Sequence, residues 1–160
     1  MAANRETVVP FDIGFLWETG APEPVLIQSP SRTFLIFHAV RDEEVGHRIE
    51  GTGVVEIVRC IKTQFGYPND EALPGHPLCR SGLGYYGVFE VLRSSWVRQM
   101  AEQNRVAFPQ SDLPWGRHFI FTFHDETFEC VCDELRPSLS WQTWNATVSE
   151  VTQRILNRSS

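Results

Sequence analysis

The amino-acid sequence predicts an α+β fold, in which two helices pack on one face of a strongly curved, mostly antiparallel sheet of about six strands. Three features support this prediction. Segments with alternating apolar residues outnumber segments with helical spacing, two segments do have helical spacing, and strands and helices do not alternate regularly. The missing alternation argues against a doubly wound parallel sheet, which is built from repeated β-α-β units.

The N-terminal part of the chain predicts strands. Every second residue from Val9 to Trp17 is apolar, and Pro10 indicates a sheet edge because proline cannot donate a hydrogen bond to a neighbouring strand. Residues 33–41 are apolar on both faces, which predicts a strand in the middle of a sheet. Residues 52–65 are rich in β-branched side chains and predict a long strand that bends.

The C-terminal part predicts another strand at residues 85–93, a hairpin and both helices. Ser94 or Ser95 is a typical N-cap for the first helix, and Ser138 or Ser140 for the second. In the second helix the apolar side chains recur at helical spacing: Trp141, Trp144, Val148, Val151 and Ile155. These patterns, without a linker or repeat, predict a single domain over residues 1–160.

Composition and charge narrow the classes of protein. Apolar residues make up 42% and charged residues 21%, which is ordinary for a globular protein. A net charge of −6 argues against nucleic-acid binding, because phosphate neutralisation dominates that affinity. No segment reaches the ~20 apolar residues of a membrane span, and the N-terminal residues do not resemble a signal peptide. We therefore expect a cytoplasmic protein whose four cysteines are reduced.

Residues 117–133 predict a β-hairpin that turns at Asp125 and Glu126 and sorts its side chains onto two faces. On the apolar face, the expected register sets Phe119, Phe121 and Phe123 opposite Cys132, Cys130 and Phe128. On the polar face, it sets His118 opposite Asp133, Thr122 opposite Glu129, and His124 diagonal to Glu129.

The group His124, Glu129 and Thr122 fits general acid or base catalysis, because a carboxylate that orients an imidazole also raises its basicity. In this hypothesis His124 is the base, Glu129 orients it, and Thr122 or Tyr86 binds the substrate. Glu90 would form an acid–base pair with Glu129 if both lie on one sheet face. The alternative is a solvated face, as in many antiparallel sheets.

The segment at residues 66–84 is the longest irregular stretch, and long loops in compact domains are often functional. It could form a lid that brings His76 over a pocket between the loop and the sheet. Arg80 or Arg117 would then hold a substrate carboxylate. The alternative is a plain surface loop with a turn after Pro68.

We expect no metal and no cofactor. Cys130 and Cys132 lie on the apolar face of the hairpin, which is typical of buried structural thiols, and no second pair has zinc-ligand spacing. The glycine-rich residues 81–87 lack the lysine of a phosphate-binding loop and the spacing of a dinucleotide fingerprint.

The sequence thus favours a small enzyme or ligand-binding domain that performs proton transfer, isomerisation or hydration on a small organic molecule. The alternative is an acidic interaction module, such as an inhibitor or immunity-type protein. It would bind a basic protein through its negative charge and exposed Trp or Tyr side chains.

Overall fold

The computed structural model describes residues 5–43 and 47–157. It confirms the α+β class, with antiparallel sheets and two helices. The chain divides into two compact units, each described here by itself. The first contains the chain up to Phe11 and Cys60–Asp133, and the second contains Asp12–Arg59 and the chain from Glu134 onward. Neither helix of the described ranges has the length and hydropathy that a membrane span requires.

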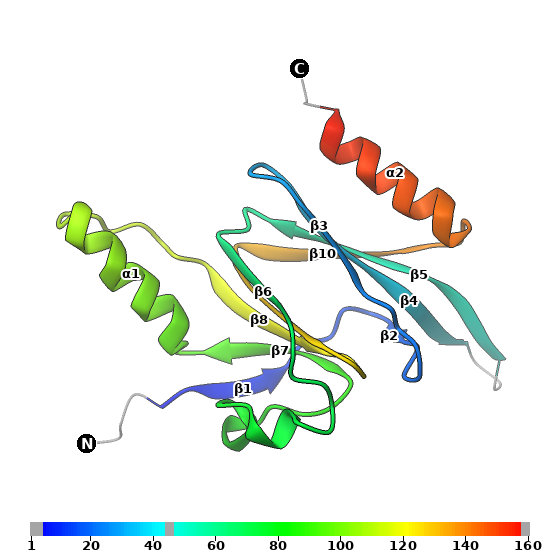
Figure 1. Cartoon of the computed structure of the whole chain (residues 1–160), viewed down its shortest axis with the longest axis horizontal. Coiled ribbons are helices and arrows are strands. Elements are labelled where there is room, and N and C mark those ends of the chain that lie inside the picture. Colours follow the sequence, from blue (N-terminus) through cyan, green and yellow to red (C-terminus); the bar gives the residue numbers. More distant parts are fainter. Residues whose placement is uncertain (1–4, 44–46, 158–160) are drawn as a thin grey trace. The chain divides into compact units, whose positions relative to one another are not determined.

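The first unit is built on a five-stranded antiparallel sheet with the strand order β1-β7-β8-β9-β6 (Figure 1). The strands are β1 (Thr7–Pro10), β6 (Lys62–Gly66), β7 (Gly87–Leu92), β8 (Arg117–Thr122) and β9 (Thr127–Cys132). Two short 3-10 helices, η1 (Leu73–Gly75) and η2 (Cys79–Ser81), lie between β6 and β7, and helix α1 (Ser95–Ala107) follows β7. Pro10 lies in the edge strand β1, as predicted.

The β8–β9 hairpin has the predicted faces, but the predicted register is wrong by two residues. Thr122 pairs with Thr127, and residues 123–126 form the connection, closed by a 3.0 Å hydrogen bond from Phe123 N–H to the carbonyl of Glu126. The turn is centred between His124 and Asp125, one residue earlier than expected, which shifts the pairing by two residues. Because this shift is even, each side chain stays on its face. Glu129 consequently pairs with Ile120 and lies diagonal to His118.

Both faces of this hairpin are buried, so the prediction of a solvated polar face is wrong. Phe119 and Phe121 are fully buried on one face, and His118 and Glu129 are only 3% and 7% exposed on the other. The irregular segment between β6 and β7 covers the second face through an apolar cluster of Val8, Leu73, Leu78, Leu83, Phe89, Val91 and Ile120. The segment is therefore part of the core and not a plain surface loop.

Helix α1 begins directly after β7 at a tight turn. Arg93 adopts a left-handed φ of 56°, and its guanidinium donates to the carbonyl of Arg5 at 2.9 Å and to Oγ1 of Thr7 at 2.8 Å. Ser94 then caps the helix by accepting a 3.2 Å hydrogen bond from the Val97 N–H, as predicted. The turn fixes Ser94 beside the sheet.

The second unit contains a sheet with the order β10-β5-β4-β2, and β3 pairs with β4 as well (Figure 1). Its strands are β2 (Leu16–Trp17), β3 (Val25–Gln28), β4 (Thr33–Glu43), β5 (His47–Val58) and β10 (Glu134–Ser140). The interior position predicted for β4 is confirmed. Helix α2 (Trp144–Leu156) packs on this sheet through an apolar cluster of Phe34, Ile36, Val54 and Val151, with Ile27, Trp144, Val148 and Ile155.

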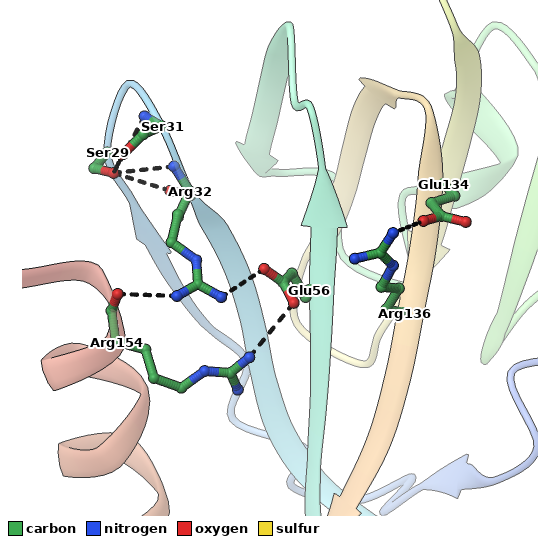
Figure 2. Close-up of polar contacts among 7 residues, drawn as sticks. All are labelled: Ser29, Ser31, Arg32, Glu56, Glu134, Arg136 and Arg154. Carbon is green, nitrogen blue, oxygen red and sulfur yellow. Dashed lines mark hydrogen bonds and ion pairs between the residues drawn. The ribbon is translucent and has the colours of Figure 1, made fainter. Parts of the chain in front are cut away.

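An ion-pair network ties the end of α2 to the sheet of the second unit (Figure 2). The Glu56 carboxylate accepts hydrogen bonds from Arg32 at 2.7 Å and from Arg154 at 3.4 Å. Arg32 also donates to the backbone carbonyl of Arg154 at 3.0 Å, and both guanidinium groups lie over the ring of Phe34. Nearby in the same view, Arg136 pairs with Glu134.

Three predictions about the architecture need correction. The described residues form two five-stranded sheets, neither strongly curled, and the two helices belong to different units. Residues 52–65 do not form one bent strand, because the chain leaves β5 after Val58, turns at Arg59 with a φ of 47° and enters the other sheet at Lys62. The cap of α2 is Thr143, since Ser138 and Ser140 belong to β10.

Candidate functional site

A buried carboxylate, Glu129 on β9, bridges two histidines in the first unit. Its Oε1 lies 3.1 Å from Nε2 of His76, and its Oε2 lies 2.8 Å from Nε2 of His118. The exposed fractions of the three side chains are 10% for Glu129, 9% for His76 and 2% for His118. A hydrogen-bonded network of this kind is held firmly, because little water can replace its internal partners.

The backbone of the irregular segment fixes the proton on His76. The Leu78 N–H donates to Nδ1 of His76 at 3.1 Å, so Nδ1 is an acceptor and the ring proton lies on Nε2. That Nε2–H faces Oε1 of Glu129. Leu78 itself is anchored in the apolar cluster below the segment. The fold therefore presents His76 to Glu129 as a hydrogen-bond donor.

Ser94 joins His118 to the start of α1. Its Oγ lies 2.8 Å from Nδ1 of His118 and also accepts the Val97 N–H. A hydroxyl donates as well as accepts, so the Ser94 O–H can donate to a bare Nδ1 and its oxygen can accept from a protonated one. His118 can therefore gain or release a proton at Nδ1 and keep both of its hydrogen-bond partners.

The charge on Glu129 is decided by two opposing effects. Burial alone would raise the pKa of this carboxyl, but hydrogen bonds from His118 and His76 outweigh burial and lower its pKa from 4.5 to about 2. Glu129 is consequently ionised at neutral pH. It is a poor base in its own right, and its role is to accept hydrogen bonds and to stabilise positive charge on its neighbours.

A pocket of about 470 Å³ opens beside this cluster and lies entirely within the first unit. Its wall includes the three clustered side chains together with Glu6, Gln64, Tyr67, Ser95 and Trp96. The Trp96 ring meets the His118 ring edge-on, with 5.1 Å between centroids. The volume is in the range of sites for small organic ligands, which is roughly 300–1,000 Å³.

A second cluster, which is more exposed to solvent, joins another part of the same irregular segment to the hairpin connection. The Asp70 carboxylate lies 2.8 Å from Nδ1 of His124 and accepts a hydrogen bond from the Tyr86 hydroxyl. The Asp70 N–H also donates to the carbonyl of His124 at 2.9 Å. The His124 side chain is 42% exposed. This cluster attaches both ends of the segment to the hairpin connection.

The three groups of the exposed cluster shift one another's pKa. The hydrogen bond from Tyr86, with the weaker one from His124, lowers the pKa of Asp70 despite some desolvation. The hydrogen bond with Asp70 raises the pKa of His124 and that of Tyr86. Asp70 is thus kept ionised, and His124 holds its proton to higher pH than an isolated histidine.

The predicted group of His124, Glu129 and Thr122 is not formed. His124 bonds to Asp70, while the hydrogen bonds of Glu129 come from His76 and His118. Thr122 is buried, donates to the carbonyl of Gly84 at 3.0 Å and accepts the Gly87 N–H at 3.1 Å, so its hydroxyl serves the backbone. The physical reason is the earlier position of the hairpin turn, because of which Glu129 pairs with Ile120 and not with Thr122.

Glu90 does not pair with Glu129, because the two lie on opposite faces of the sheet. In the paired strands Glu90 faces Phe119, whereas Glu129 faces Ile120. Arg117 instead donates two hydrogen bonds of 2.7 Å to the Glu90 carboxylate. These hydrogen bonds raise the pKa of Arg117.

The four predicted ligand-binding residues do not come together in one pocket either. Only His76 lines the pocket. Arg80 lies exposed in η2, Tyr86 bonds to Asp70, and Arg117 bonds to Glu90, and none of the three lines this pocket. An anionic substrate group would therefore meet no arginine or lysine in its wall.

The sequence predicts other roles for two residues of the site. It sets His118 opposite Asp133, and it predicts Ser94 only as a helix cap. The sequence did indicate that His118 and Glu129 share a face of the hairpin. A shift of the expected register by two residues leaves both side chains on that face. Nothing local indicates that His76 or Ser94 would meet them.

The cysteines and metal-binding side chains give no further site. Cys130 and Cys132 are buried, as predicted, and burial raises the pKa of the Cys130 thiol. Within residues 5–43 and 47–157, three or more His, Cys, Asp or Glu side chains nowhere come together in a way that could hold a metal ion.

Comparisons of the chain with protein-family models, with curated proteins and with solved structures found no match.

Proposed function

We propose that the first unit binds a small organic molecule in the pocket of about 470 Å³ and performs acid–base chemistry on it. One observation carries this proposal. The wall of the pocket contains a buried, ionised carboxylate, Glu129, that is held between two imidazoles. Buried carboxylate–histidine networks with a shifted pKa are more frequent at functional sites than elsewhere.

Glu129 has room for a ligand. A carboxylate offers about four acceptor positions, and His76 and His118 use one on each oxygen. Since Glu129 is ionised and no arginine or lysine lines the pocket, its charge favours a ligand with N–H or O–H donors. Trp96 and Tyr67 supply flat apolar surface against which such a molecule can pack.

His118 is the group best suited to exchange a proton. The Ser94 hydroxyl can hydrogen-bond to Nδ1 of His118 whether or not that nitrogen carries a proton. The Glu129 carboxylate stabilises the imidazolium. Proton transfer, isomerisation and hydration are reactions that such a group can catalyse. The role first assigned to His124 passes to His118 in this proposal.

The proposal is tested by screening small fragments against the protein with ligand-observed NMR. Fragments with hydrogen-bond donors should bind the wild type and lose about tenfold or more in affinity in the Glu129→Gln variant, because a charged acceptor becomes neutral. Trp96→Ala should weaken the same fragments. The matched control is Glu56→Gln, which removes a carboxylate that bridges two arginines in the second unit. Fragments that bind Glu129→Gln as well as wild type would refute the proposal.

A second candidate function is binding of a basic protein. It is favoured by the net charge of −6 and by aromatic side chains that face solvent, Tyr67 at 80% exposure and Trp141 at 56%. Such binding should weaken steeply between low and high salt, because complementary charge steers it. Affinity for basic proteins that does not change with salt would count against this candidate.

A further inference from the structure

We infer that Ser94 is a nucleophile that hydrolyses esters carrying a negative charge, in a second cavity that shares His118 with the first. This goes beyond the proposed ligand pocket and does not depend on what that pocket binds. The inference rests on three observations: a serine–histidine–carboxylate chain, a cavity at the serine, and the charge of that cavity's wall.

The chain of contacts has the order required to activate a hydroxyl. Ser94 Oγ lies 2.8 Å from Nδ1 of His118, and Nε2 of His118 lies 2.8 Å from the Glu129 carboxylate. An imidazole held by a carboxylate can take the hydroxyl proton on its other nitrogen, and the carboxylate then stabilises the imidazolium. Either ring nitrogen can act as the base, so the use of Nδ1 toward serine does not alter the chemistry.

The backbone around Ser94 resembles the turn on which nucleophilic serines are carried. The serine follows strand β7 and precedes helix α1, and the residue before it, Arg93, has a left-handed φ of 56°. A sharp strand-to-helix turn carries the nucleophilic serine in the nucleophile elbow as well, but here the left-handed residue is Arg93, and Ser94 itself has an extended backbone with a φ of −51°. Ser94 is largely buried, at 8% exposure, which matches a nucleophile that is reached only through a cavity.

That cavity has a volume of about 370 Å³ and lies within the first unit. Ser94 and His118 both line it, with Val91 and Val97 as apolar wall. The serine and the histidine that would act as its base therefore border the same cavity.

The charge of the wall selects the substrate. Three arginines and one carboxylate line the cavity. Arg117 is neutralised by Glu90, but among the described residues Arg93 donates only to uncharged oxygens of Arg5 and Thr7. The Arg98 backbone N–H donates to the carbonyl of Ser94, while its side chain makes no hydrogen bond or ion pair within the part of the chain that the structure describes. Two guanidinium groups of the wall thus have no carboxylate partner within those residues, and a carboxylate or phosphate on the substrate would meet them.

The reaction balances with water as the second reactant. Ser94 Oγ attacks the ester carbonyl carbon while its proton moves to Nδ1 of His118, and the alcohol leaves with that proton as its C–O bond breaks. Water then attacks the acyl-serine ester and gives a proton to Nδ1. The carboxylic acid leaves, and Ser94 Oγ recovers the proton. Glu129 is a positioning residue in this reaction, because it acts on Ser94 only through its hydrogen bond with His118.

The decisive experiment uses the full chain and a fluorophosphonate probe, with the modified residue located by peptide mass spectrometry. The expected result is an adduct on Ser94 in the folded wild type and in Ser149→Ala, a control at an exposed serine of α2. Labelling should disappear in urea and in Ser94→Ala. It should slow about a hundredfold or more in His118→Gln, because a general base is lost. Glu129→Gln should slow labelling less and change its pH dependence.

The main measurement, the adduct on Ser94, is made on the wild-type protein. The result therefore stands even if one of the variants does not fold. A folded wild-type protein without an adduct on Ser94 would overturn the inference, as would an adduct whose rate is the same in folded His118→Gln. A second measurement tests whether the positive charge of the cavity selects the substrate. Arg98→Gln should reduce kcat/KM for the mono-4-nitrophenyl ester of succinate about tenfold and leave that for neutral 4-nitrophenyl acetate nearly unchanged. Equal effects on both esters would overturn the assigned substrate class.

Discussion

Two carboxylate–histidine clusters join the same irregular segment to the same hairpin, but they differ in their exposure to water. In the buried cluster the Glu129 and His118 side chains are 10% and 2% exposed, whereas His124 in the other cluster is 42% exposed. Their carboxylates both have a lowered pKa, through hydrogen bonds with histidine and, for Asp70, with Tyr86. The pKa direction alone therefore does not separate the two sites.

What separates them is the cost of removing one partner. A buried ion pair or charged hydrogen bond leaves an unsatisfied group behind when it is broken, while an exposed pair is replaced by water. The buried cluster should consequently matter for both stability and chemistry. The exposed cluster should act mainly as an attachment of the segment, and the following changes test that distinction.

The largest expected effect is that of Glu129→Ala. It would leave the Nε2–H groups of His76 and His118 without an acceptor inside the protein, so the free energy of unfolding should fall by about 3–5 kcal/mol. Urea unfolding followed by tryptophan fluorescence measures this loss. Glu129→Gln keeps the shape and one acceptor and should cost less. A loss no larger than that of Asp70→Ala would show that burial does not distinguish the clusters.

The next effect is on stability at low pH. The folded pKa of Glu129, about 2, lies below its ordinary value of 4.5. The resulting stabilisation is complete above pH 4.5 and is lost as the pH falls toward 2, and it amounts to about 3 kcal/mol by linkage. Unfolding of wild type and Glu129→Gln should be compared across this range. The difference between them should shrink as the pH falls, and a constant difference would contradict the low pKa.

The smallest effect concerns His124. Its hydrogen bond to Asp70 raises its pKa, so Asp70→Asn should lower the His124 pKa toward that of a free histidine. NMR titration of the ring protons measures this change, with Glu71→Gln as a control for a neighbouring charge of the same segment. Added salt should reduce the difference between wild type and Asp70→Asn, because the pair is exposed. A His124 pKa that does not respond to Asp70→Asn would remove this cluster from the comparison.

Local patterns were sufficient for most of the secondary structure. A run that is apolar on both faces predicted the strand that begins at Thr33, the pattern of residues 85–93 predicted β7, and Ser94 was one of the two serines expected to cap α1. The apolar face of the hairpin, with Phe119 and Cys130, was also recognised, since the two-residue period of a strand depends only on the sequence. The patterns failed where the chain passes between sheets, at Arg59, because a strand break of three residues has no strong local signature.

The candidate site could be predicted only in part. Glu129 and His76 were among the chosen residues, but His118 and Ser94 were not, because the contact of Glu129 with His118 depends on where the hairpin turns. The contact with His76 depends on how the segment before β7 folds back over the sheet. Both are contacts between residues far apart in the chain, and no periodicity in the sequence encodes them.

By itself, the sequence determined that the chain is α+β and that His118 and Glu129 share one face of the hairpin, because both follow from side-chain period and residue type. Only the tertiary structure decided that this face is buried, that His76 and Ser94 reach it, and that His124 turns instead to Asp70. Burial is a property of what packs on a surface. The same two residues would form a weak surface pair in water, and they form a site because Leu73, Leu78 and Leu83 carry the irregular segment over them.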